Sequence, residues 1–480
     1  MENKPKILAL ASILSHHAGM RDYIFEHALF LVTIPLTLLF ATFILRARKP
    51  SGSTVAWLIL VITVPYLGIP LYLMLGGRKM PTRLNEKPEL RPLKIAKSFQ
   101  PKNVDGVLKI LAASGIPDPR ENEGLRLLEN GEVAFARYMA LIEQAKTSIF
   151  VTTFIFGNDD VGRALLEALA RKAKAGVDVR VIVDSIGAVM TRHPSLFNFK
   201  KSHGQLAYFM PLLHVPFKGR SNLRNHRKLL IVDGEFAILG GMNLAQEYMG
   251  PVPDICRWTD LAIEVEGASV ADLTNVFLQD WSFAKHLSTE VVTVPGTALS
   301  NSSGNVAQVV PSGPDLPGDP LYDILLNTIF SARREILIVT PYFIPDESLE
   351  KALDLAAKRG VKISVLLPRK SNHFLADIAR GSFIRQLLTS GVRFHFYDKM
   401  IHAKAVLIDD AIGLLGSANF DMRSLLLNYE LGLIIYDEPF LKVARDWFEI
   451  HVKSATEDFP KANVWRETIE GLGRVIGPMI

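Results

Sequence analysis

The feature that most constrains the fold of this chain is an internal duplication in its last 380 residues. Each copy reads as an apolar strand, an amphipathic helix that ends in basic residues and a glycine, and a second and third apolar strand. In that order, the matched segments are 143–156, 163–176, 177–184 and 204–210 in the first copy, and 330–343, 348–360, 361–368 and 391–397 in the second. The alternation of strands and helices predicts an α/β body made of two similar halves.

Both halves continue with the same polar pattern, H-x-K-x4-D. Its members are His226, Lys228 and Asp233 in the first half, and His402, Lys404 and Asp409 in the second. If the pattern lies within a strand, alternation places the histidine and lysine on one face and the aspartate on the other. A histidine and a lysine aimed at one point would stabilise the negative charge of a phosphodiester, whereas the aspartate is expected to play an orienting, structural role.

A Gly-small-x-Asn turn follows each motif and ends at Asn243 or Asn419. The asparagine amides are expected to donate hydrogen bonds to phosphoryl oxygens. Gly241 and Ser417 occupy equivalent positions in the two turns, and only the serine can add a hydroxyl donor.

A histidine that acts as a nucleophile or an acid needs an acceptor for its second ring nitrogen. Asp260 is the expected acceptor for His226, and Glu430 for His402, since each lies downstream in the same half. Taken singly, each histidine would be interpreted as a hydrogen-bonded core residue and each acid as an ordinary surface acid. Their occurrence in both halves favours the functional interpretation. The neighbouring lysines would repel a divalent cation, so no metal is expected.

Two apolar runs without charge precede the body, at 28–45 and 55–75. Each is long enough for a transmembrane helix, and both are predicted to be one. Pro65, Gly68 and Pro70 predict a kink in the second. Buried core helices are the alternative, but these rarely lack charge over such a length.

Charge is distributed unevenly along the chain. Residues 1–100 carry 13 Lys and Arg against five Asp and Glu, a net +8, which leaves −3 for the rest. Of these basic residues, three lie in the loop 46–49 between the two apolar runs, and ten lie before the first run or after the second. Because basic residues are enriched on the cytoplasmic side, this distribution favours a cytoplasmic body. The cluster Arg78–Lys97 would attract anionic lipid headgroups or serve as a solvated linker. A body without excess positive charge argues against nucleic acid as a partner.

The paired motifs resemble those of the phospholipase D superfamily. The two N-terminal runs, the RNHRK sequence at 224–228 and GGMN at 240–243 resemble bacterial cardiolipin synthases of the A type in particular. This resemblance implies two halves related by a pseudo-twofold axis, with both motifs at one interfacial site. It implies that His226 attacks phosphorus to form a phosphohistidine, and that His402 acts as acid and base. The implied reaction converts two phosphatidylglycerol molecules into cardiolipin and glycerol without a metal, nucleotide or other cofactor.

The expected organisation has six parts. They are an N-terminal segment (1–27), two transmembrane helices (28–75), a basic juxtamembrane linker that enters the body (76–124), a first half (125–297), a connector (298–320) and a second half (321–480). The expected location is the bacterial inner membrane, with several crossings. Phosphatidylglycerol and anionic membrane lipids are the expected partners, and neither nucleic acid nor an obligate protein partner is expected.

Four alternatives share these motifs. A phospholipase D would transfer the phosphatidyl group to water, and a related synthase would use another alcohol, such as serine, or another phosphatidyl donor. A membrane-tethered nuclease would use the same constellation on DNA, although its groove should be basic. A lipid-binding scaffold without catalysis would tolerate a broken motif, whereas both motifs are intact here.

Overall fold

The computed structural model of the chain describes residues 32–47, 51–77, 79, 104–191, 196, 199, 201–211, 222–287 and 305–476. The chain divides into a small N-terminal unit and a large unit that holds the duplicated body. The expected N-terminal segment 1–27 and most of the basic cluster at 78–97 lie outside the described residues.

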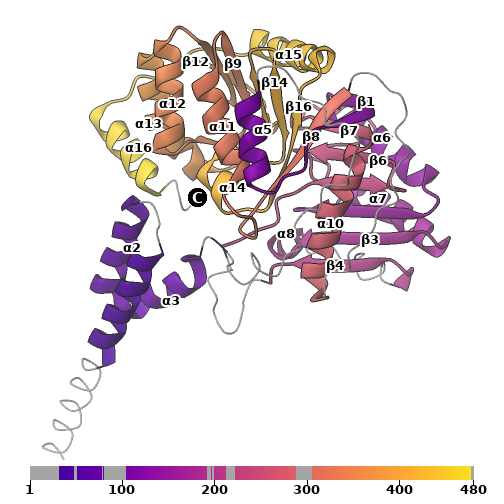
Figure 1. Cartoon of the computed structure of the whole chain (residues 1–480), viewed down its shortest axis with the longest axis horizontal. Helices are drawn as coiled ribbons and strands as arrows, with labels where there is room; N and C mark the ends of the chain where they lie inside the picture. The colour runs from indigo at the N-terminus through magenta and orange to yellow at the C-terminus, as the bar shows by residue number, and fades with distance from the viewer. Residues whose placement is uncertain are drawn as a thin grey trace, which may run out of the picture. The chain divides into compact units, whose positions relative to one another are not determined.

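The large unit is built on one 14-stranded sheet, and its strand order confirms the duplication. From the centre outward, the first half runs β1, β7, β6, β5, β2, β3, β4, and the second runs β8, β16, β14, β13, β9, β11, β12. In each half the outer three strands pair in parallel and the inner ones antiparallel. β1 and β8 pair antiparallel where the halves join (Figure 1). Each half is therefore the same unit, repeated about the middle of the sheet.

The first-half strands are β1 (Arg120–Leu128), β2 (Ser148–Thr153), β3 (Asp178–Asp184), β4 (Gln205–Phe209), β5 (Leu229–Val232), β6 (Phe236–Gly240) and β7 (Ala262–Gly267). The second-half strands are β8 (Asn305–Ser312), β9 (Glu335–Val339), β11 (Lys362–Pro368), β12 (Arg393–Tyr397), β13 (Ala405–Ile408), β14 (Ile412–Gly416) and β16 (Glu430–Ile435). A separate two-stranded sheet joins β10 (Phe343–Ile344) and β15 (Phe420–Asp421).

Helices accompany these strands. The first-half helices are α6 (Gly131–Gln144), α7 (Asp160–Lys174), α8 (Ser185–Thr191) and α10 (Ser269–Lys285). The second-half helices are α11 (Pro320–Ser331), α12 (Glu347–Lys358), α13 (Phe374–Thr389), α14 (Met422–Leu426), α15 (Glu438–Lys453) and α16 (Val464–Ile476). α5 (Asp105–Ala113) precedes β1 in the chain but packs against α11 of the second half (Figure 1). α7 and α12 are the predicted repeat helices. Each begins at an aspartate cap and is followed by a glycine at positive φ, Gly176 at 93° and Gly360 at 88°, where a side chain would be strained.

The interval expected to be a connector, 298–320, contains a central strand. β8 is buried along nearly its whole length, and Val309 and Val310 belong to a core that also includes Ile263 of the first half. The strand was not predicted because its short apolar run lies between Ser, Gly and Pro residues, which are typical of a connector. A shared hydrophobic core at this junction makes the two halves one folded body.

The small unit contains a helix over residues 32–46, α2 (Ser51–Thr63) and α3 (Pro65–Leu75). The second apolar run is thus divided at Val64, directly before Pro65, which agrees with the predicted kink. A Cβ on Gly68 would lie 2.6 Å from the carbonyl oxygen of Leu60, so α3 approaches α2 closely. Within the described part of the chain, no helix combines the length and apolarity needed to cross a bilayer.

Candidate active site

The two H-x-K-x4-D motifs surround short strands instead of lying inside them, which corrects the sequence-based expectation. His226 and Lys228 precede β5, and Asp233 lies in the turn after it, at φ 54°. His402, Lys404 and Asp409 are arranged in the same way around β13, with Asp409 also at φ 54°. The four buried residues of each strand separate the chemistry-bearing pair from the aspartate.

Each motif aspartate holds the start of a neighbouring strand. The Asp233 carboxylate accepts backbone hydrogen bonds of 2.7–2.9 Å from Lys146, Thr147 and Ser148, at the start of β2. The Asp409 carboxylate accepts bonds of 2.6–2.8 Å from Arg333, Arg334 and Glu335, at the start of β9. These bonds lower the pKa of Asp233 despite the opposing effect of burial. Both aspartates therefore position strands, away from the histidines.

The histidines and their carboxylate partners are crossed between the halves. His226 Nδ1 lies 3.0 Å from Glu430 Oε1, and His402 Nδ1 lies 2.8 Å from Asp260 Oδ2. The expected pairing of each histidine with the acid of its own half was therefore wrong. Because each pair needs one residue from each half, the two motifs form one site.

Backbone pairing produces this crossing. The amide of His226 donates to the carbonyl of Tyr429, the residue before Glu430. The amide of His402 donates to the carbonyl of Thr259, the residue before Asp260. Each histidine is thereby placed beside the carboxylate residue of the other half, Glu430 for His226 and Asp260 for His402.

The lysines and aromatic rings complete the surroundings of the histidines. Lys228 and Lys404 are both buried, and the Nζ of each donates to the backbone carbonyl of its own motif's histidine, at 2.7 Å for Lys228. Lys404 Nζ also lies 2.7 Å from His402 Nδ1 and 3.0 Å from Nε2. The rings of Tyr248 and Trp258 lie 5.0 and 5.5 Å from that of His402, and Phe154 lies 5.5 Å from that of His226. These rings line the site with apolar surface, and the sequence analysis did not single them out.

Burial dominates the ionisation of the site. It lowers the pKa of His226 to about 4, and Lys228 adds to this while Glu430 opposes it. Burial also lowers the pKa of His402 well below its ordinary value, with Lys404 contributing, and lowers that of Lys404 to about 8. Both histidines are therefore neutral near pH 7 without substrate. A neutral His226 that donates its Nδ1 proton to Glu430 leaves the lone pair of Nε2 free for attack.

The two carboxylates differ in character. Burial raises the pKa of Asp260 to about 6, which Lys404 only partly offsets. For Glu430, burial raises the pKa, but the interactions with His226, Lys228 and Ser417 outweigh burial and lower it. Ser417 Oγ donates to Glu430 Oε2 at 2.5 Å, and Asn428 Nδ2 lies 3.3 Å from Oε1. Glu430 is thus the more firmly ionised acid.

This arrangement changes the role expected for Ser417. Its hydroxyl is committed to Glu430, so it supports the partner of His226 instead of waiting for a phosphoryl oxygen. At the equivalent position, a Cβ on Gly241 would lie 2.4 Å from Asp260 Oδ1. Glycine is required there because the Asp260 carboxylate fills the space.

Arg227 was missed as a site residue, although it lies inside the first motif where the second has Ala403. Its fully buried guanidinium binds Asp280 at 2.6 Å and donates to the backbone carbonyls of Glu430 and Ser312 at 3.0 Å. It ties the first motif to β8 and β16 of the second half. The sequence did carry a signal for it: a charged residue stands between His226 and Lys228, where the second motif has an alanine.

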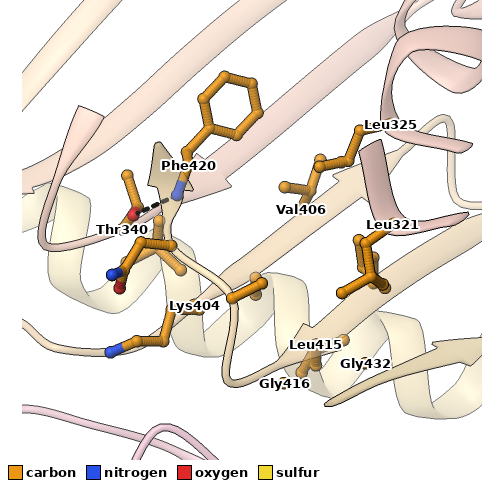
Figure 2. Close-up of a pocket in the computed structure, with 14 residues that line it drawn as sticks. Leu321, Leu325, Thr340, Lys404, Val406, Leu415, Gly416, Phe420 and Gly432 are labelled. Carbon is orange, nitrogen blue, oxygen red and sulfur yellow. Dashed lines mark hydrogen bonds between the residues drawn. The ribbon is translucent and has the colours of Figure 1, made fainter. Parts of the chain in front are cut away.

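The turn asparagines are both buried but differ in their bonds. Asn243 Oδ1 accepts from the amide of Ile155 at 3.1 Å, and Asn419 Nδ2 donates to Ser424 Oγ at 3.1 Å. Asn419 also lines a small pocket with Lys404 and Thr340. In Figure 2, Lys404 extends away from the apolar residues of this pocket, and the Thr340 hydroxyl accepts from the amide of Phe420 at 3.0 Å. The two asparagine hydrogen bonds tie Asn243 to the segment after β2 and Asn419 to α14.

Among the described residues, no cluster of three or more His, Cys, Asp or Glu side chains is arranged to hold a metal ion. Burial lowers the pKa of Lys228 well below its ordinary value, as it lowers that of Lys404 to about 8. A phosphodiester anion bound beside the two lysines would favour their charged forms and be stabilised by them. A duplicated body with two histidine–lysine pairs in one site is the arrangement of a two-histidine phosphodiester transferase.

Comparison with known proteins agrees with this class. The family model described as "Cardiolipin synthase, PLD-like domain" matches residues 138–281 and 325–452, and "Phospholipase_D-nuclease N-terminal" matches 36–77. A cardiolipin synthase 1 of Bacillus cereus is 31% identical over 99% of this chain and 97% of its own. A major cardiolipin synthase of Bacillus subtilis is 31% identical over 91% of this chain and 95% of its own.

Among solved structures, a phosphatidylserine synthase of Haemophilus influenzae has a TM-score of 0.59 at 16% identity, and covers 78% of this chain and all of its own. That likeness concerns the fold. The sequence matches extend over nearly the full length, and this chain therefore belongs to the cardiolipin synthase family of the phospholipase D superfamily.

Proposed function

We propose that the chain joins two phosphatidylglycerol molecules into cardiolipin and releases glycerol. Two observations support this: the near-full-length similarity to cardiolipin synthases, and the single site in which each histidine is held by a carboxylate of the other half. One site with two histidines suits a double displacement, in which one phosphodiester is broken and another is made.

In the first step, His226 Nε2 attacks phosphorus of the donor lipid and forms an N–P bond as the P–O bond to glycerol breaks. Glu430 accepts the hydrogen bond from Nδ1–H, which stays on the ring, and its negative charge stabilises the positive charge that develops there. His402, protonated once the phosphodiester anion is bound, gives its proton to the departing glycerol oxygen. Lys228 and Lys404 neutralise the charge on the phosphoryl oxygens.

In the second step, the headgroup hydroxyl of another phosphatidylglycerol enters. His402, now neutral, removes the hydroxyl proton while the oxygen attacks phosphorus and the N–P bond breaks. His226 returns to its starting state. The geometry supports His226 as the nucleophile, because Glu430 is held ionised by three hydrogen-bonding partners, whereas the pKa of Asp260 beside His402 is raised.

We include membrane attachment in the proposal, with residues 28–45 and 55–75 in the bilayer of a bacterial inner membrane and the body on the cytoplasmic side. Large apolar side chains are exposed along the described part of both runs, among them Leu38, Phe43, Ile59 and Leu67. Such surfaces are stable in lipid and costly in water.

The decisive experiment supplies the purified full chain with vesicles of pure phosphatidylglycerol and identifies the products. Cardiolipin with an equal amount of glycerol supports the proposal. Phosphatidic acid with glycerol would instead identify a hydrolase. Adding phosphatidylethanolamine or serine tests other donors and acceptors, and a DNA substrate tests the nuclease alternative.

A further inference from the structure

The C-terminal helix α16 is amphipathic, but its faces are inverted relative to those of an ordinary packed helix. Its apolar residues point outward: Val464, Trp465, Ile469 and Leu472 are between 50% and 78% exposed. These positions share one side of a helix with 3.6 residues per turn. A helix on the surface of a globular protein normally buries that side.

The inward face of α16 is attached through charges. Glu470 is buried and binds Arg385 of α13 at 2.7 Å and Arg466 at 2.9 Å. Arg474 reaches Glu350 of α12 at 2.5 Å. The helices also approach closely, since a Cβ on Gly381 would lie 2.4 Å from the Glu470 carboxyl carbon. These bonds fix which side of α16 faces outward.

α13, which packs against α16, begins with two more exposed apolar residues, Phe374 at 75% and Leu375 at 56% (Figure 1). We call these two residues and the four of α16 the apolar ridge. Its α13 end lies beside the active site. The His373 ring lies 5.2 Å from that of Tyr342, which directly precedes β10, and β10 pairs with β15 just after Asn419.

We propose that the apolar ridge inserts into the surface of an anionic phospholipid bilayer and presents the entrance of the active site to its lipid substrates. Three observations favour lipid over another occupant. The α13 end of the ridge directly follows His373, which lies near the active site, the α16 end includes a tryptophan suited to the headgroup region, and an exposed lysine precedes each end, Lys370 before Phe374 and Lys461 before Val464.

Site-directed spin labels test the location of the ridge without any measurement of catalysis. The full chain with Cys256→Ser, which removes its one cysteine, is labelled at Ile469→Cys or Leu472→Cys and reconstituted in phosphatidylethanolamine–phosphatidylglycerol vesicles. Glu467→Cys, exposed on the opposite side of α16, is the matched control. Oxygen concentrates in lipid, whereas a water-soluble nickel chelate does not enter it.

The proposal predicts high oxygen and low nickel accessibility at 469 and 472, and high nickel accessibility at 467. High nickel accessibility at all three positions would overturn it, because the ridge would face water. Low accessibility to both reagents at 469 and 472 would also overturn it, because protein would cover the ridge, either another segment of this chain or a second copy.

A kinetic test rests on the proposed function and so is kept separate. Trp465→Ser with Ile469→Ser should raise the apparent KM for phosphatidylglycerol in vesicles about tenfold, because the variant loses interfacial binding. Turnover of a short-chain phosphatidylglycerol dissolved as monomers should be unchanged. An equal loss on both substrates would contradict a docking role, whereas a failure to make cardiolipin would leave the spin-label result intact.

Discussion

His226 and Glu430 lie 204 positions apart in the sequence and in opposite halves of the body, yet His226 Nδ1 is 3.0 Å from Glu430 Oε1. The reciprocal pair joins His402 to Asp260. Neither half can therefore orient its own histidine. The duplication acts as one catalytic unit, and the consequences of changing either acid should appear at the histidine of the other half.

Glu430→Gln should impair the formation of the phosphatidyl-enzyme, although Glu430 lies in the second half. Loss of the ionised acceptor should slow attack by His226 by about 10²–10⁴-fold. Asp260→Asn, the matched variant, should retain the burst when the substrate carries a good leaving group that needs little protonation. Rapid-quench kinetics with an activated phosphatidyl ester measure both. A lost burst in Asp260→Asn and a retained one in Glu430→Gln would contradict the crossed assignment.

The pH profile of kcat/KM should be bell-shaped. On the acid side the rate rises as His226 loses its proton near its pKa of about 4 and Asp260 ionises near about 6. On the alkaline side it falls as the two buried lysines lose their charge, Lys404 near a pKa of about 8 and Lys228 with a pKa that burial holds well below its ordinary value. Lys404→Arg should shift the alkaline limb, because arginine stays protonated and Lys228 alone then determines the limb. An alkaline limb that is unchanged in this variant would exclude Lys404 as its source.

Gly241→Ser should reduce activity even though it makes the two turns alike. A Cβ there would lie 2.4 Å from the Asp260 carboxylate and push it away from His402. Ser417→Gly should be milder, because it leaves the Asp260 carboxylate in place. It removes the hydrogen bond to the charged Glu430, worth about 1.5–3 kcal/mol, and the one that Ser417 Oγ accepts from the amide of Leu431. Steady-state rates on phosphatidylglycerol vesicles rank the variants. Full activity in Gly241→Ser would show that the close approach to Asp260 does not restrict this position.

Asp233→Ala should weaken the fold more than the chemistry. It removes three backbone hydrogen bonds at the start of β2 and places alanine at φ 54°, at a cost of about 1–3 kcal/mol in the free energy of unfolding. Asp233→Asn tolerates the backbone conformation and should lose less. Denaturant titration in detergent gives the stability of each variant. A loss of turnover as complete as in His226→Ala, with unchanged stability, would instead place Asp233 in the reaction.

The fold was largely predictable because its two halves repeat the same sequence pattern. The apolar segments and the glycines at 176 and 360 predicted the strand–helix–strand units, and both motifs predicted the two histidine–lysine pairs. β8 was not recognised, because one short strand between Ser, Gly and Pro residues has no local signal that outweighs its neighbours.

The partners within the site could not be predicted from spacing. Asp260 and Glu430 follow their own histidines at similar distances, so sequence separation gives no reason to cross them. The crossing depends on the long-range backbone bonds from His226 to Tyr429 and from His402 to Thr259. The same holds for Ser417, whose hydroxyl is directed at Glu430 by the course of β14 and β16.

The central claim is that His226 forms the covalent intermediate while His402 transfers the proton. Its most direct test is mass spectrometry of the protein trapped with an activated phosphatidyl ester, on the wild type, His226→Ala and His402→Ala. The account predicts the phosphatidyl adduct on His226 in the wild type, its persistence in His402→Ala, and no adduct in His226→Ala. An adduct on His402 in the wild type, or one that survives His226→Ala, would contradict it.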